Sequence, residues 1–186
     1  SKETPNLQFH VQPISTDILG ASKLHDFDGI TPTVANIRPS SRGEISIVSN
    51  DSRINPKIKM NYLSTQDDRM VAAQGLKLVR KIMLETETFK KYEPEEYRPG
   101  VHITDNEELV KAGSEFTQTI FHPVGTCKMG KDENAVVNDK LYVHGLQNLR
   151  VIDASIMPNI TSGNTNAPTI MIAEKGADFI LNNQKK

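Results

Sequence analysis

Residues 148–181, NLRVIDASIMPNITSGNTNAPTIMIAEKGADFIL, pass from one hydrophobic pattern to another within a single stretch. The run LRVI at 149–152 is short and mostly apolar, which is typical of a buried strand, and Pro158 ends it. After a polar segment, apolar side chains recur on one helical face, and Pro168 is tolerated in the first turn of a helix. The residues on that face are Ile170, Ala173, Ala177, Ile180 and Leu181. The stretch therefore predicts a strand, a polar connection and a packed helix.

Segments nearer the N-terminus show the pattern of strands. In LQFHVQPI, residues 7–14, apolar and polar side chains alternate, which is typical of a half-buried strand. TVANIRP at 33–39 and EISIVS at 44–49 predict two more strands, joined by a turn at 42–43. Several strands separated by short turns favour an antiparallel sheet.

The periodicity changes to that of helices in two later segments. Residues 65–84 carry apolar side chains at helical spacing, and Ser64 stands three residues before Asp67, close to a capping box. Thr104 and Glu107 form a capping box ahead of a second helix with one apolar side. Together these patterns predict an α+β fold, an antiparallel sheet with packed helices.

Composition and charge exclude several classes of protein. With 186 residues, 37% of them hydrophobic, the chain can build a real core. The net charge of −1 supplies no basic field for a nucleic acid, and no apolar run reaches the roughly 18 residues of a membrane span. A single cysteine cannot form an internal disulfide, which fits a cytoplasmic location. Because the chain opens on SKETPNL without a methionine, we expect a fragment of a longer protein.

The segment FHPVGTCKMG, residues 121–130, is the first candidate for chemistry. His122 precedes a proline, which favours an extended backbone, and Gly125 allows a tight turn just beyond. Such a bend presents the imidazole ring in a fixed direction. A histidine that merely closes a loop hydrogen bond would give the same pattern, so the segment alone leaves both interpretations open.

The segment IDASIMPNITSGNTNAPT, residues 152–169, is the second candidate. Serine, asparagine, threonine and glycine residues lead into the N-terminus of the predicted helix. Unpaired N–H groups and the helix dipole at such an end suit an electron-rich ligand atom. An ordinary asparagine or threonine cap is the alternative interpretation.

Three segments in this order resemble the C-terminal signature of the glucose-methanol-choline (GMC) family of flavin-dependent alcohol oxidoreductases. They are HPVGTCKMG at 122–130, NLRVIDASIMP at 148–158 and SGNTNAPTIMIAEKGAD at 162–178. A weaker resemblance extends back through QFH, RPSSRGEI and the helix after YLSTQDD. It implies that residues 1–147 form the substrate-binding domain and that residues 148–186 form a strand and a helix that return to the FAD-binding domain.

The resemblance also implies the residues of the site. In this family the histidine of the first segment is the base or hydrogen-bonding partner of the substrate hydroxyl, a position that corresponds to His122. A second residue beside it, histidine in some members and asparagine in others, corresponds to Asn166. Some of the family's cofactor-binding positions lie near the ribityl and phosphate portion of FAD, and others lie near the pyrimidine edge of its ring. Together they correspond to five residues of this chain. They are Asp153, Ala154, Asn166, Ala167 and Pro168.

What the resemblance implies chemically is the oxidation of an alcohol to a carbonyl. FAD takes the hydride from carbon, while the protein holds the hydroxyl and accepts its proton, for which a neutral imidazole is suited. A complete family member also carries a G-x-G-x-x-G turn for the flavin diphosphate, and these 186 residues contain none. We therefore expect an N-terminal FAD-binding half as the partner of this chain, and no turnover by the chain alone.

The segments look most similar to the choline and alcohol dehydrogenase branch, so the expected substrate is a small-molecule alcohol. Two alternatives stay open, an oxidase of the same family that uses O2 and a non-catalytic binding or partner domain that keeps the fold. Cys127 follows His122 closely, but no third group orients the pair, so we do not expect a nucleophile there. The other histidines show no metal-ligand spacing, and no metal site is expected.

Overall fold

The computed structural model describes residues 3–18 and 22–183. They divide into two compact units. The first unit consists of the chain up to Arg42 together with Asn61–Ile120, and the second consists of Gly43–Met60 together with the chain from Phe121 onward. Within the described part of the chain, no helix combines the length and the apolar character needed to cross a bilayer.

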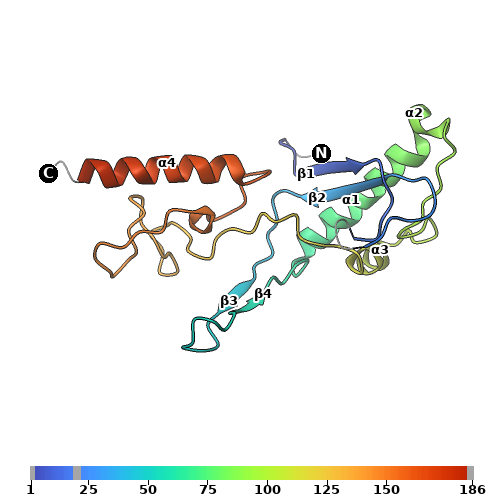
Figure 1. The fold of residues 1–186 in the computed structure, drawn as a ribbon. Helices are drawn as coiled ribbons and strands as arrows, with labels where there is room; N and C mark the ends of the chain where they lie inside the picture. The colour runs from blue at the N-terminus through green and yellow to red at the C-terminus, as the bar shows by residue number, and fades with distance from the viewer. Residues whose placement is uncertain (1–2, 19–21, 184–186) are drawn as a thin grey trace. The chain divides into compact units, whose positions relative to one another are not determined.

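A two-stranded antiparallel sheet begins the first unit (Figure 1). β1, Leu7–Gln12, pairs along its whole length with β2, Thr31–Asn36. α1, Gln66–Glu85, packs against β2. The buried Gly75 permits this approach, because a Cβ at that position would lie 3.0 Å from the side chain of Val34.

The predicted strand is confirmed as β1, but its polar face is the less exposed one. Phe9 and Val11 are 39% and 60% exposed. On the opposite face, the Nε2 atom of His10 and the Oε1 atom of Gln12 are buried, and the described residues provide no hydrogen-bond partner for either. Alternation predicts which side chains share a face but not which face is covered.

The two predicted helices of this unit also form, with their caps one residue later than expected. Thr65 rather than Ser64 caps α1, and Asp105 rather than Thr104 caps α3, Asn106–Ser114, which packs against α1. The Asp105 carboxylate accepts the N–H groups of both the second and the third residue of α3. These backbone hydrogen bonds lower the pKa of Asp105.

Asp68, in the first turn of α1, is buried and anchors the segment that follows β2. Its Oδ1 accepts the N–H of Ser40 at 2.9 Å and the amide N–H of Asn36 at 3.2 Å, and its Oδ2 accepts the N–H of Ser41 at 2.8 Å. Burial by itself would raise the pKa of Asp68, but the hydrogen bonds from Ser41 and Ser40 outweigh it, so the pKa lies below its ordinary value.

An ion pair holds the loop that follows α1 and the short helix α2, Glu87–Lys90. The Arg80 guanidinium makes two hydrogen bonds to Glu96, at 2.7 and 2.9 Å. It also donates to the carbonyl oxygens of Gly100 and Ile103. The planar guanidinium therefore satisfies one carboxylate and two backbone acceptors at once.

The second unit contains a hairpin and an irregular region that leads into one long helix. β3, Glu44–Ser46, pairs antiparallel with β4, Lys57–Lys59. A single 3-10 turn, η1, spans Ala154–Ile156, and α4 spans Asn166–Asn183. The predicted α+β class with antiparallel strands is confirmed. Among the described residues, however, the strands form two separate two-stranded sheets instead of one larger sheet, because β1 pairs only with β2, and β3 only with β4.

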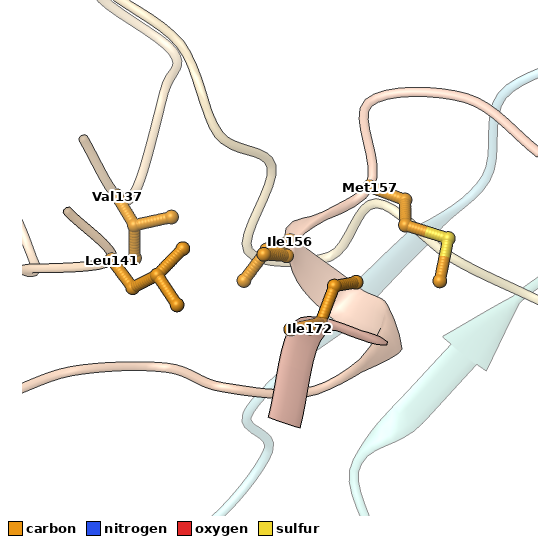
Figure 2. Close-up of a cluster of buried hydrophobic side chains, with 5 residues drawn as sticks. All are labelled: Val137, Leu141, Ile156, Met157 and Ile172. Carbon is orange, nitrogen blue, oxygen red and sulfur yellow. The ribbon is translucent and has the colours of Figure 1, made fainter. Parts of the chain in front are cut away.

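A small core holds the irregular region together. It consists of Val137, Leu141, Ile156, Met157 and Ile172, and Figure 2 shows that these side chains come from a loop, from η1 and the residue after it, and from α4. On α4, a Cβ at Gly176 would collide with the side chain of Ile152. Glycine at this position therefore lets α4 lie directly against the segment that enters η1.

The strand predicted from the apolar run at 149–152 does not form in the described chain. Arg150 makes an isolated bridge with Tyr142, and the Val151 N–H donates to the carbonyl oxygen of Leu141 at 3.2 Å, after which the chain turns into η1. A strand requires a neighbour that continues the ladder over several residues, and this unit supplies only single pairs. The prediction of a strand from an apolar run was wrong here.

The C-terminal helix is confirmed as α4, but a different face is covered. Ile172 and Gly176 are buried, whereas Ile170 and Leu181, on the predicted packing face, are 54% and 62% exposed. α4 is thus apolar on two sides, of which one packs within the second unit. The boundary predicted at residue 148 concerns packing onto an FAD-binding domain, and it stays a prediction.

Candidate functional site

The bend around His122 forms as the sequence predicts. Phe121 has a φ of 64° and Gly125 a φ of 92°, so the chain turns sharply on both sides of the histidine. A Cβ at Gly125 would lie 3.3 Å from the carbonyl oxygen of Met157, so the glycine also permits a close approach to the chain after η1. The half-buried His122 ring is therefore carried by a constrained loop.

Backbone hydrogen bonds tie this loop to η1. The Cys127 N–H donates to the carbonyl oxygen of Ser155 at 3.0 Å, and the Met129 N–H donates to that of Ile156 at 2.8 Å. The Cys127 side chain is half-buried, and the hydrogen bonds of the His122 ring in the described structure go to other residues. The backbone of Cys127 thus helps to hold this loop against η1.

Both nitrogens of the His122 ring meet the polar segment that precedes α4. Nδ1 lies 3.0 Å from Oγ1 of Thr165 and 3.4 Å from the backbone N of the same residue. Nε2 lies 3.0 Å from Nδ2 of Asn164. Thr165 is buried and Asn164 is exposed. Two segments that are more than 40 residues apart in sequence are thus joined at one imidazole ring.

Asn166, the predicted companion of His122, is the first residue of α4 and is exposed. Among the described residues, no hydrogen bond joins its side chain to the ring. The role of Asn166 therefore stays a prediction. The residues that sequence reasoning missed are Asn164 and Thr165, although both lie in the polar segment that was singled out as a possible helix cap.

The predicted cofactor-binding residues lie at the N-terminal ends of η1 and α4. Asp153 is exposed and caps η1, since its Oδ1 accepts the N–H of Ser155 at 2.8 Å, and Ala154 is the first residue of the turn. Ala167 and Pro168 follow Asn166 in the first turn of α4. All of the predicted site residues, including His122, belong to the second unit.

The described residues contain no cluster of three or more histidine, cysteine, aspartate or glutamate side chains that could hold a metal ion. The predicted site residues and their neighbours provide an imidazole, an exposed carboxylate, side-chain amides and the first N–H groups of a long helix. They are suited to binding hydroxyl and carbonyl groups.

Comparisons with known sequences identify relatives. Residues 39–173 match the model of the GMC oxidoreductase family. An oxygen-dependent choline dehydrogenase from Proteus mirabilis (strain HI4320) is 45% identical over 176 residues, which cover 95% of this chain and 31% of that relative. The chain thus spans roughly a third of the length of the curated relatives it matches.

Solved structures share the fold as well. Pyridoxine 4-oxidase from Mesorbium loti aligns with a TM-score of 0.84 at 29% identity, over 94% of this chain and 34% of that one. A formate oxidase from Aspergillus oryzae RIB40, studied for its FAD modification, aligns with a TM-score of 0.87 at 26% identity, over 98% of this chain and 32% of that one. The two solved structures share the fold of this chain, and the family model covers most of its sequence. The chain therefore belongs to the GMC oxidoreductase family.

Proposed function

We propose that this chain is the C-terminal, substrate-binding and catalytic part of an FAD-dependent alcohol dehydrogenase that oxidises a CH–OH group to a carbonyl. The observation that carries the proposal is the meeting of two separate family segments at the His122 ring, within 3.0 Å on each nitrogen. An imidazole held by hydrogen bonds on a constrained loop is suited to accept a proton from a bound hydroxyl.

The groups of the second unit fit FAD by their chemistry. The exposed Asp153 carboxylate can accept hydrogen bonds from the hydroxyl groups of the ribityl chain, and Ala154 lies beside it. The N–H groups of Asn166 and Ala167, at the start of α4, can donate to a carbonyl of the pyrimidine ring, while Pro168 has no N–H and offers only packing. When bound, FAD supplies the acceptor for the hydride that leaves the substrate carbon.

The remaining chemistry belongs to residues of this chain. Nε2 of His122 accepts the proton of the substrate hydroxyl as the C–H bond breaks, which contributes roughly 10²–10⁴-fold to the rate. The side-chain amide of Asn166 donates a hydrogen bond to the same oxygen and stabilises the developing negative charge. The Asn166 amide cannot take up a proton at neutral pH, so proton transfer depends on His122.

The proposal includes a partner, an N-terminal FAD-binding half joined to this chain. Support comes from the lengths of the relatives, of which this chain covers about a third, and from the exposed apolar face of α4 that carries Ile170 and Leu181. Packing residues 148–186 onto the FAD-binding domain would cover this face. The chain alone should not oxidise alcohols, and the single cysteine suits a cytoplasmic enzyme.

The substrate we propose to test first is choline, because the relative with 45% identity is named a choline dehydrogenase. A second candidate function is oxidation of the alcohol with O2 as the electron acceptor, which the names of the structural neighbours, pyridoxine 4-oxidase and formate oxidase, favour. The two differ in the step that reoxidises the flavin, and the residues of this chain serve the alcohol in both.

The test is anaerobic mixing of the full-length, FAD-loaded enzyme with choline and with simple primary alcohols. The proposal predicts bleaching of the flavin absorbance and formation of the aldehyde. The rate at which air then reoxidises the flavin distinguishes an oxidase from a dehydrogenase. The isolated chain, titrated with FAD, should bind weakly or not at all. If the full-length protein binds FAD but no alcohol reduces it, the alternative of a non-catalytic binding domain is favoured.

A further inference from the structure

Thr165 occupies the position of a helix cap, but its hydroxyl is used elsewhere. The Thr169 N–H donates to the Thr165 carbonyl oxygen at 3.1 Å, so Thr165 makes the first backbone hydrogen bond of α4. A threonine at this position ordinarily accepts the N–H of the second or third helical residue. The third residue here is Pro168, which has no N–H, and the Thr165 hydroxyl lies instead 3.0 Å from Nδ1 of His122.

Because Thr165 is buried, its hydroxyl needs a hydrogen-bond partner within the protein. Thr165 is 6% exposed, and a buried hydroxyl without a hydrogen-bond partner is costly. The His122 ring is the partner that the described structure gives to Oγ1 of Thr165. The interaction therefore fixes the direction of the ring and gives the buried Thr165 oxygen a hydrogen-bond partner.

The pattern of donors at the two ring nitrogens points to one tautomer. The Asn164 amide nitrogen lies 3.0 Å from Nε2, and an amide N–H can donate only to a nitrogen that carries no proton. The proton of the neutral ring then resides on Nδ1 and is donated to Oγ1 of Thr165. The Thr165 backbone N–H also donates toward Nδ1 at 3.4 Å, which would favour the opposite tautomer, but this contact is longer, and therefore weaker, than the two 3.0 Å contacts of the ring.

We propose that Thr165 is a positioning residue for His122. Its hydroxyl oxygen accepts the Nδ1 proton and so leaves the lone pair on Nε2, the nitrogen that faces the exposed Asn164. A substrate hydroxyl replaces the Asn164 amide at Nε2 and gives its proton to that atom. The Nδ1–H···Oγ1 hydrogen bond then persists and becomes charge-assisted in the imidazolium. This inference rests on the proposed role of His122 as the proton acceptor.

The test uses the full-length, FAD-loaded enzyme with four variants, Thr165→Val, Thr165→Ser, His122→Ala and the His122→Ala, Thr165→Val double variant. Thr165→Val keeps the shape but removes the hydroxyl, and we expect flavin reduction about 5–30-fold slower because one orienting hydrogen bond is lost. Thr165→Ser keeps the hydroxyl and should restore most of the rate. In a His122→Ala background, Thr165→Val should produce no further slowing, since Thr165 acts only through the ring.

A spectroscopic measurement reports the tautomer without reference to activity. Long-range ¹H–¹⁵N correlation NMR of the enzyme labelled with [¹⁵N]histidine, with His122 assigned by comparison with His122→Ala, should show Nδ1 protonated and Nε2 unprotonated in the neutral ring. This measurement on the wild type remains decisive even if Thr165→Val does not fold.

The variants distinguish the proposed function of His122 from the positioning role of Thr165. If His122→Ala reduces its flavin at the wild-type rate, the proposed function of His122 is contradicted. If His122→Ala is slow but Thr165→Val matches the wild type, only the positioning role fails. An Nε2-protonated ring, or equal slowing by Thr165→Ser and Thr165→Val, would also overturn the positioning role.

Discussion

The two units of the chain differ in how they are built and in what they carry. The first unit has regular elements, a β1–β2 ladder and helices α1 and α3 that pack on one another. The second unit depends on a few buried side chains, from loops, η1 and α4, yet it contains all of the predicted site residues. Binding and catalytic residues commonly lie on loops that a rigid scaffold positions.

The comparison teaches that regular secondary structure is not what aligns this site. Single backbone bonds to η1 hold the His122 loop, and the His122 ring is held by side chains that precede α4. Substitutions that remove these contacts should therefore affect catalysis, and equally severe ones in the first unit should mainly affect stability.

The largest expected effect belongs to His122→Ala. Loss of the proton acceptor should slow anaerobic flavin reduction roughly 10²–10⁴-fold in the full-length enzyme. The matched control is His144→Ala, since His144 is an exposed histidine of the same unit whose ring bonds the carbonyl oxygen of Gly130. Its rate should stay within about twofold of the wild type, as for a surface substitution. Equal slowing in both variants would contradict the assignment.

Truncation of a buried side chain distinguishes the units most directly. Ile156→Ala and Leu109→Ala both create cavities at fully buried positions and should each lower the free energy of unfolding by about 2–5 kcal/mol. At a temperature where both variants are folded, Ile156→Ala should also slow flavin reduction, because Ile156 lies in the segment that holds the His122 loop. A greater rate loss in Leu109→Ala would reverse the comparison.

Asn166→Ala should have an intermediate effect. Loss of one hydrogen bond to the substrate oxygen amounts to about 1–3 kcal/mol, which corresponds to roughly a five- to 150-fold slower reduction of the flavin. Both side chains would act on one transition state, so the double variant with His122→Ala should be less impaired than the product of the single effects. Strict multiplication of the two effects in stopped-flow experiments would indicate that they act independently.

Asp68→Asn tests a stabilising interaction of the first unit, and its effect on the free energy of unfolding should decrease at acid pH. The amide cannot accept all of the N–H groups that the carboxylate binds, so the free energy of unfolding should fall by about 1–3 kcal/mol near pH 7. The folded-state pKa of Asp68 is lowered, so its contribution is complete above the unfolded-state value. The difference between variant and wild type should narrow as the pH falls below about 4.

The matched control for this position is Asp67→Asn, an exposed aspartate in the same first turn of α1. Its effect on urea-induced unfolding should be within about 0.5 kcal/mol. Neither variant should change flavin reduction at neutral pH. A difference between Asp68→Asn and the wild type that stays constant from pH 7 to acid would show that the ionised carboxylate is not what stabilises the fold.

The smallest effect is expected for Cys127→Ser. The Cys127 backbone N–H bonds to Ser155, and in the described structure its side chain is not a partner of the His122 ring, so most of the activity should remain. Steady-state turnover of choline is a sufficient measurement. A loss beyond roughly a hundredfold, in a variant that still binds FAD, would restore the cysteine nucleophile as a hypothesis.

Sequence reasoning performed differently in the two units. The strands expected at 7–14 and 33–39 form as β1 and β2, the second of them at 31–36, and the two helices of the first unit, which have periodic patterns and capping residues, also form. In each helix the observed cap lies one residue after the expected one, because the two neighbouring residues can both cap a helix. The neighbours are Ser64 and Thr65 in one helix, and Thr104 and Asp105 in the other. Local chemistry alone does not choose between such neighbours.

In the second unit the sequence predicted the bend at His122 better than the secondary structure. The bend at His122 follows from Pro123 and Gly125, which act on the backbone locally. The absence of a ladder at 148–158 and the contact of the ring with Thr165 depend on which distant segments meet, and no local pattern encodes that. The role of His122 is implied by the resemblance to a family and stays a prediction, whereas the partners of its ring required the structure.

The most direct test of the central claim, that His122 accepts the substrate proton, is the rate of anaerobic flavin reduction as a function of pH in the wild type and in His122→Ala. The wild-type rate should rise with pH as the imidazole loses its proton and then reach a plateau, because only the neutral ring can act as the base. In His122→Ala the rate should be low at every pH and should lack that inflection. The same inflection and plateau in the variant would show that the base is another residue.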